Sequence, residues 1–249
     1  MEQFLLLFDN AILYPFVLLF ARVVSFVAFM PVFGDKAISP TIRIAFAFYL
    51  SIFLFPLVDI QTNVTEDTFI EALISEVTLG LVASFLMHAI FAAVSIIGDL
   101  IGYATALSMA NMFDPVTGTQ QNVVGKFLYM IILVLYFETG MYEVTLVMLH
   151  MSFDSIHLGG FNLFAYDGVN FAIDEVKKMF AFAFSFAFPL FFIGFVLDVY
   201  YGYGTKSMPA FSPFVITFQV KFILIFVFML LGMEIFAESF KNYFINKFG

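Results

Sequence analysis

Long apolar stretches, separated by short polar or turn-rich segments, run through the whole sequence. A bilayer core of about 30 Å is crossed by roughly 20 mostly apolar helical residues, and six stretches meet or approach that length. They are Asn10–Phe33, Ile44–Val58, Val77–Gly98, Lys126–Met151, Met179–Leu197 and Phe214–Ala237. Membrane β-strands alternate apolar and polar residues, whereas these runs are continuous. The pattern therefore predicts an all-α, polytopic membrane protein built of helical hairpins.

A seventh apolar stretch, Leu100–Phe113, is too short to cross a bilayer and indicates a re-entrant or buried segment. Pro115 disfavours helical backbone at Asp114, and the polar residues of Val116–Asn122 cannot face lipid. Residues 98–125 are therefore expected to form an inserted hairpin whose polar tip meets protein or water at membrane depth. An ordinary loop outside the membrane is the alternative.

Small residues recur at every fourth position where this insert begins. Gly98, Gly102, Ala106 and Ala110 would lie on one face of a helix, and small side chains let a second helix approach closely. We expect these four positions to mediate close helix packing.

Composition excludes an ordinary soluble domain. Of 249 residues, 63% are hydrophobic and 12% charged, and the mean hydropathy is +1.03. The net charge of −9 argues against nucleic-acid binding, and the N-terminus lacks the basic region of a signal peptide, so the first helix is expected to be retained. The chain has no cysteine, and no catalytic constellation or nucleotide fingerprint is recognisable. Residues 1–249 are expected to form one domain that is not an enzyme and takes no cofactor or metal.

Four charged residues fall within the apolar stretches: Arg22, Glu138, Glu143 and Lys221. A charge at the centre of a membrane helix costs roughly 2.5–3.5 kcal/mol on insertion scales. We expect these side chains to pair within the chain or across contacts with other subunits. Glu138 and Glu143 are separated by about 140° around a continuous helix, which disfavours a paired-carboxylate site. Snorkelling of Lys221 and an ion or proton path are the alternatives.

The insert resembles the FliR family of flagellar export proteins and their virulence-secretion counterparts. The resemblance rests first on Gly98-Asp-Leu-Ile-Gly102-Tyr103, Leu107-Ser-Met-Ala110 and Phe113-Asp-Pro115. It extends to Arg22, Pro31, Gly34, Pro40, Arg43, Glu76, Gly80, Ser152-Phe153 and Gly159-Gly160. The chain departs from the family pattern at Ala106, Met141 and Phe218-Gln219.

The resemblance implies a noncatalytic core subunit of the flagellar type III export gate, in the inner membrane at the flagellar basal body. FliP-like and FliQ-like subunits, FlhB-type and FlhA-type export proteins, membrane lipid and unfolded export substrates would be its partners. The insert would project into the pore as a plug, formed by Leu107, Met109, Asn111, Met112, Phe113, Asp114 and Pro115. A secondary transporter or ion channel for a small solute is the alternative function. It would need discontinuous helices in both halves of the chain, and only one half has a clear insert.

Overall fold

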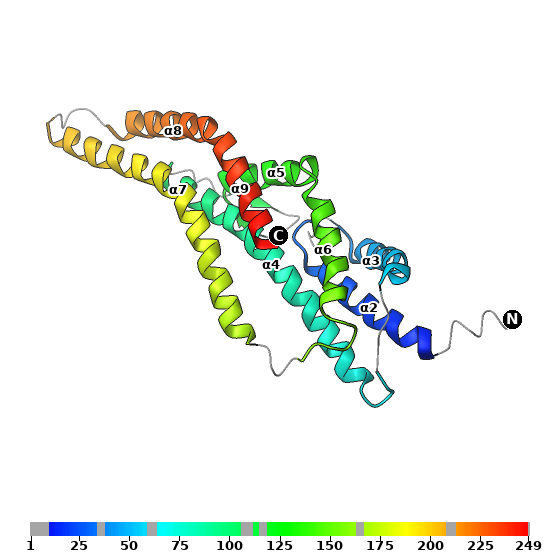
Figure 1. The fold of residues 1–249 in the computed structure, drawn as a ribbon. Coiled ribbons are helices and arrows are strands. Elements are labelled where there is room, and N and C mark those ends of the chain that lie inside the picture. Colours follow the sequence, from blue (N-terminus) through cyan, green and yellow to red (C-terminus); the bar gives the residue numbers. More distant parts are fainter. Residues whose placement is uncertain are drawn as a thin grey trace. The chain divides into compact units, whose positions relative to one another are not determined.

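A computed structural model describes residues 10–33, 38–58, 64–105, 112–114, 119–162, 167–207 and 213–248. Nearly all of these residues lie in helices (Figure 1). Four of the described helices are long and apolar enough to cross a membrane, or up to six if each of two interrupted helix pairs counts as one span. The predicted all-α polytopic fold is confirmed. The described residues form two compact units, and the expectation of a single domain stays a prediction.

Unit 1 comprises residues up to His88 together with Thr139–Ile173. Its elements are α2 (Asn10–Phe29), α3 (Pro40–Leu54), the 3-10 helix η2 (Phe55–Leu57), the first part of α4 (Phe69–Ala104) and α6 (Met141–Ser155). Helix α3 begins at a clear sequence signal, because the Ser39 hydroxyl accepts from the Ile42 amide and Pro40 occupies the first turn. Aromatic rings join α2 to α3, with the ring centroids of Phe16 and Phe48 6.0 Å apart in an edge-to-face arrangement.

Unit 2 comprises Ala89–Glu138 and the chain from Asp174 onward. It contains the second part of α4, the strands β1 (Met112–Asp114) and β2 (Thr119–Gln121), and four helices. These are α5 (Val123–Glu138), most of α7 (Gly168–Ser207), α8 (Pro213–Leu231) and α9 (Met233–Phe248).

The core of unit 2 follows the helical period. Buried side chains recur at every fourth position of α5 and α9, at Val124, Leu128, Ile132, Tyr136, Phe236, Phe240 and Phe244. The ring of Phe91 on α4 lies 6.0 Å from that of Tyr136 and 6.3 Å from that of Phe240. This aromatic cluster joins α4, α5 and α9, since a stripe with this spacing faces one side of each helix.

The structure corrects the prediction of one unbroken helix over Lys126–Met151. Helix α5 ends at Glu138 and α6 begins at Met141, and Gly140 between them has φ 72°. That left-handed conformation cannot continue a right-handed helix and favours glycine, which has no Cβ.

The last predicted helix is also interrupted. The segments Gln219–Leu231 and Met233–Lys247 are bent by 54° at Gly232, and α9 extends beyond the predicted end at Ala237. Two other helices are longer than predicted, since α4 has 36 residues and α7 has 40. Helix α7 is extended by polar residues at both ends, whereas α4 also takes in residues 100–104, the first part of the predicted seventh apolar stretch.

Candidate functional site

The predicted plug segment contains a short antiparallel hairpin. Strand β1 pairs with β2 in the register Met112 to Gln121, Phe113 to Gln120 and Asp114 to Thr119. Three of the predicted plug residues, Met112, Phe113 and Asp114, thus form β1. The others, Leu107, Met109, Asn111 and Pro115, lie outside the described residues. A two-stranded hairpin is marginally stable alone, so its position depends on the helices at its base.

The helices at that base approach each other at glycine. A Cβ on Gly98 of α4 would lie 2.1 Å from the Cα of Gly125 on α5, and a Cβ on Gly102 would lie 1.4 Å from the side-chain nitrogen of Asn122. Neither position has room for a side chain in this arrangement. The other two members of the predicted small-residue stripe, Ala106 and Ala110, lie outside the described residues.

A buried ion pair lies at the centre of unit 1. Nε of Arg22 on α2 donates to Oε2 of Glu76 on α4 at 2.5 Å, and Nη2 donates to Oε1 at 3.1 Å. The two residues are 2% and 0% exposed. The paired, two-point geometry offsets the cost of burying both charges.

The same two side chains hold the segment that follows α6. Arg22 also donates to the main-chain oxygens of Ser152, at 2.8 Å, and Ile156, at 3.0 Å. The Glu76 carboxylate accepts from the Gly159 amide at 2.8 Å. The guanidinium lies 4.3 Å from the centre of the Phe153 ring, within cation–π range. Because the two side chains bind each other and also main-chain groups after α6, the Arg22–Glu76 pair connects α2, α4 and the end of α6.

A second ion pair connects two helices of unit 2. Nζ of Lys221 on α8 donates to Oδ2 of Asp198 on α7 at 2.6 Å, with Lys221 buried and the Asp198 side chain 55% exposed. Helix α7 has Gly194 beside the lysine stem, where an added Cβ would lie 3.1 Å from Cε. The lysine charge therefore reaches a half-exposed carboxylate from an apolar helix face.

The two glutamates lie on different helices. Glu138 is exposed at the last residue of α5, and Glu143, in the first turn of α6, accepts from the Tyr142 hydroxyl at 2.9 Å. Within the described ranges, no three His, Asp or Glu side chains are grouped closely enough to hold a metal ion. The absence of a metal stays a prediction.

Glu76 and Asp198, the partners of Arg22 and Lys221, are not predicted by the sequence pattern. The paired residues are 54 and 23 positions apart, so helical periodicity does not connect them. Asn122 was also missed as a site residue, although an Asn directly before an apolar helical run is a signal for a helix start.

The chain matches the model of one protein family, described as bacterial export proteins, family 1, over residues 13–246. The chain belongs to this family. The flagellar biosynthetic protein FliR of Bacillus subtilis is 28% identical over 93% of this chain and 91% of its own length. FliR of Aquifex aeolicus is 26% identical over 91% and 88%, and FliR of Caulobacter vibrioides is 28% identical over 85% of each chain. The resemblance to the FliR family is thus confirmed for this member of the bacterial export proteins.

Proposed function

We propose that this chain is a core subunit of the flagellar protein-export gate in the bacterial inner membrane, at the flagellar basal body. It assembles with FliP-like and FliQ-like subunits and adjoins FlhB-type and FlhA-type export proteins. Membership of an export family and the names of the relatives support the flagellar role.

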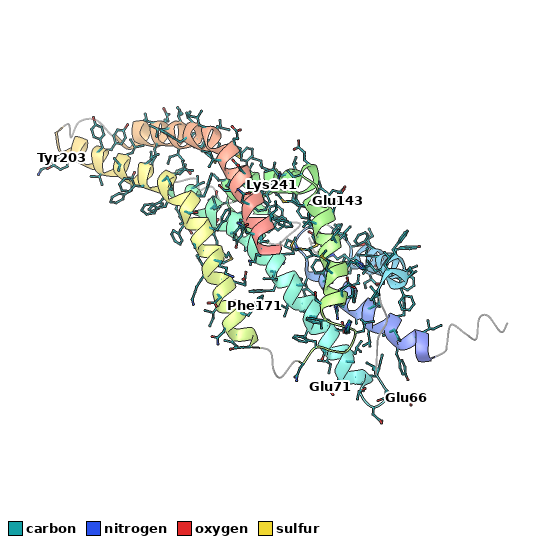
Figure 2. All side chains as sticks on the ribbon, viewed as in Figure 1. Glu66, Glu71, Glu143, Phe171, Tyr203 and Lys241 are labelled. Carbon is teal, nitrogen blue, oxygen red and sulfur yellow. The ribbon has the colours of Figure 1, made fainter. Side chains whose placement is uncertain are left out.

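One observation, the length and exposed apolar surface of α7, carries the assembly proposal. Its 40 residues correspond to about 60 Å, twice the hydrocarbon thickness of a bilayer. Large apolar side chains are exposed along it: Phe180, Phe184, Phe188, Phe192, Phe195, Val199, Tyr200 and Tyr203. Figure 2 shows side chains projecting along α7 as far as Tyr203. The exposed side chains from Phe180 to Tyr203 cover about 35 Å of this helix, more than the roughly 30 Å hydrocarbon core of a bilayer, so other subunits are proposed to cover the apolar surface that lipid does not reach.

The plug of this gate is the insert of residues 98–125, which contains the β1–β2 hairpin. The small size of this hairpin and its connection to glycine-packed helices support a role as an obstacle in the channel. In this role the hairpin holds back ions and unfolded substrates until export begins.

Co-purification tests the assembly proposal. The tagged chain, expressed with FliP-like and FliQ-like subunits, is expected to purify as a complex with them and to be unstable when expressed alone. A chain that is stable alone and binds a small solute would instead support the transporter alternative.

Leakage tests the plug. Deleting Met112–Asp114 is expected to raise potassium efflux from vesicles that contain the assembled gate, because β2 loses its partner strand. The exposed variant Asn170→Ala, at the start of α7, serves as a control and should leave efflux unchanged. Unchanged efflux from the deletion variant in a complete assembly would refute the plug role.

A further inference from the structure

The side chain of Asn122 occupies the junction between the hairpin and the helices of unit 2. Asn122 directly follows β2 and directly precedes α5, and it is 6% exposed. Asn122 is therefore the only residue between β2 and α5, and its conformation sets the direction of the hairpin relative to α5.

The two ends of the Asn122 amide bind two different elements. Its Oδ1 accepts from the Val124 amide at 3.1 Å, which caps the start of α5. Its Nδ2 donates to the main-chain oxygen of Gly98 on α4 at 3.2 Å. Capping alone needs only the oxygen, so the bond to α4 is an additional function of the amide.

Helix α4 is shaped to receive this amide. An added Cβ on Gly102 would lie 1.4 Å from Nδ2 and 2.5 Å from Cγ of Asn122, so the amide fills the space that a side chain at position 102 would take. By contrast, a Cβ on Gly125 would meet its nearest neighbour, the main-chain oxygen of Ser95, at 3.8 Å, an ordinary contact. The tight fit is thus specific to Gly98 and Gly102.

Thr105, directly after the last residue of α4, bonds only within its own helix turn in the described contacts. The Thr105 hydroxyl, on a fully buried residue, donates to the main-chain oxygen of Ile101 at 2.9 Å and lies 3.2 Å from that of Gly102. This bond stays within the last turn of α4, whereas the Asn122 amide connects the segment after β2 to that helix.

We infer that Asn122 is a positioning residue that holds β2, and through it the β1–β2 hairpin, against the Gly98–Gly102 edge of α4. The inference rests on the proposed plug function. Loss of the bond from the Asn122 amide to Gly98 is expected to loosen β2 while the close contact of Gly98 with Gly125 is retained.

Two substitutions distinguish the bond from the Asn122 amide to Gly98, called the tether below, from the capping bond to the Val124 amide. Asn122→Asp keeps an oxygen for the Val124 amide but replaces the donor to Gly98 with a second acceptor. Gly102→Ala leaves Asn122 intact and displaces its amide. Each is expected to raise potassium efflux through the assembled gate by about 2-fold to 10-fold, the shift in a two-state population that one lost hydrogen bond produces.

The control and the double variant make the test specific. Gly125→Ala adds a methyl group at the same junction with ordinary contacts and should leave efflux unchanged. In the Asn122→Ala background the space beside Gly102 is empty, so adding Gly102→Ala should raise efflux no further.

The Met112–Asp114 deletion distinguishes failure of this inference from failure of the plug proposal. If the deletion leaks and Asn122→Asp and Gly102→Ala do not, the tether is refuted while the plug stands. The inference about Asn122 would also be refuted if Asn122→Asp and Gly102→Ala both lost co-purifying subunits and thermal stability. A positioning residue should change efflux while the complex stays intact. A deletion that does not leak refutes the plug, and the tether with it.

Discussion

The ion pairs of this chain differ widely in burial, and therefore in how much they are expected to contribute to the stability of the fold. Arg22 and Glu76 are both almost completely buried, and each also binds main-chain groups of the segment after α6. Lys177 and Asp174, also an ion pair, have side chains that are 70% and 63% exposed. Exposed pairs contribute about 0–1 kcal/mol, whereas breaking a buried pair leaves an uncompensated charge.

Replacing Glu76 by Gln is therefore expected to destabilise the protein by about 3–5 kcal/mol, because Arg22 would keep its charge in a buried site. The Gln side chain retains only one acceptor oxygen for the two donors of Arg22 and the Gly159 amide. Thermal unfolding of the purified complex in detergent measures the change. Asp174→Asn, which removes the same charge from an exposed pair, is the matched control and should shift the midpoint little. A Glu76→Gln midpoint as high as that of the control would contradict this account.

At the scale of helices, close crossings are set by single glycines. A Cβ on Gly80 of α4 would lie 1.9 Å from the Ser25 hydroxyl and 2.5 Å from the main-chain oxygen of Arg22. Helices α2 and α4 therefore cross at Gly80, one turn after Glu76, and this close crossing brings Glu76 within reach of Arg22. A glycine in a helix otherwise lowers its stability, so packing accounts for its presence.

Gly80→Ala is expected to force α2 and α4 apart and to cost about 1–3 kcal/mol, the usual range for overpacking. The main-chain oxygen of Arg22 cannot move aside in the way a flexible side chain can. Gly202→Ala in α7 is the control, since an added Cβ there meets nothing within 4 Å, and it should be neutral or slightly stabilising. Equal thermal midpoints for the two variants would refute the close crossing.

At the scale of the whole molecule, much of the apolar surface is not covered by the chain itself. The exposed side chains of α7 include Phe184, at 48%, and Phe188, at 57%. Under the proposed assembly, other subunits cover part of this surface and lipid covers the rest.

Changing both Phe184 and Phe188 to Ser is expected to reduce recovery of the FliP-like and FliQ-like subunits about tenfold or more, since each buried Phe contributes about 1.5–3 kcal/mol. Quantitative co-purification from membranes measures this recovery. The double change to Leu preserves apolar area and membrane insertion, and it should retain the partners. If the Ser variant recovered them as well as the Leu variant does, this part of α7 would be in contact with lipid rather than protein.

Local sequence patterns were sufficient for the fold class and for most of the helices. Continuous apolar runs specify membrane helices without reference to any other part of the chain. The same patterns did not place the breaks at Gly140 and Gly232, because glycine is compatible both with a helix interior and with its end. The left-handed backbone at Gly140 became evident only in the folded chain.

The pairing of the charges depended on the tertiary structure. The apolar setting of Arg22 and Lys221 already indicated that each needs a partner, since an isolated charge in such a helix is costly. Glu76 and Asp198 lie on other helices, and their selection followed from how those helices cross. The same holds for Asn122, whose two-ended amide has a role only because α4 presents Gly98 and Gly102 beside it. Apolar periodicity is a local property of the chain, whereas the pairing of distant polar groups depends on tertiary packing.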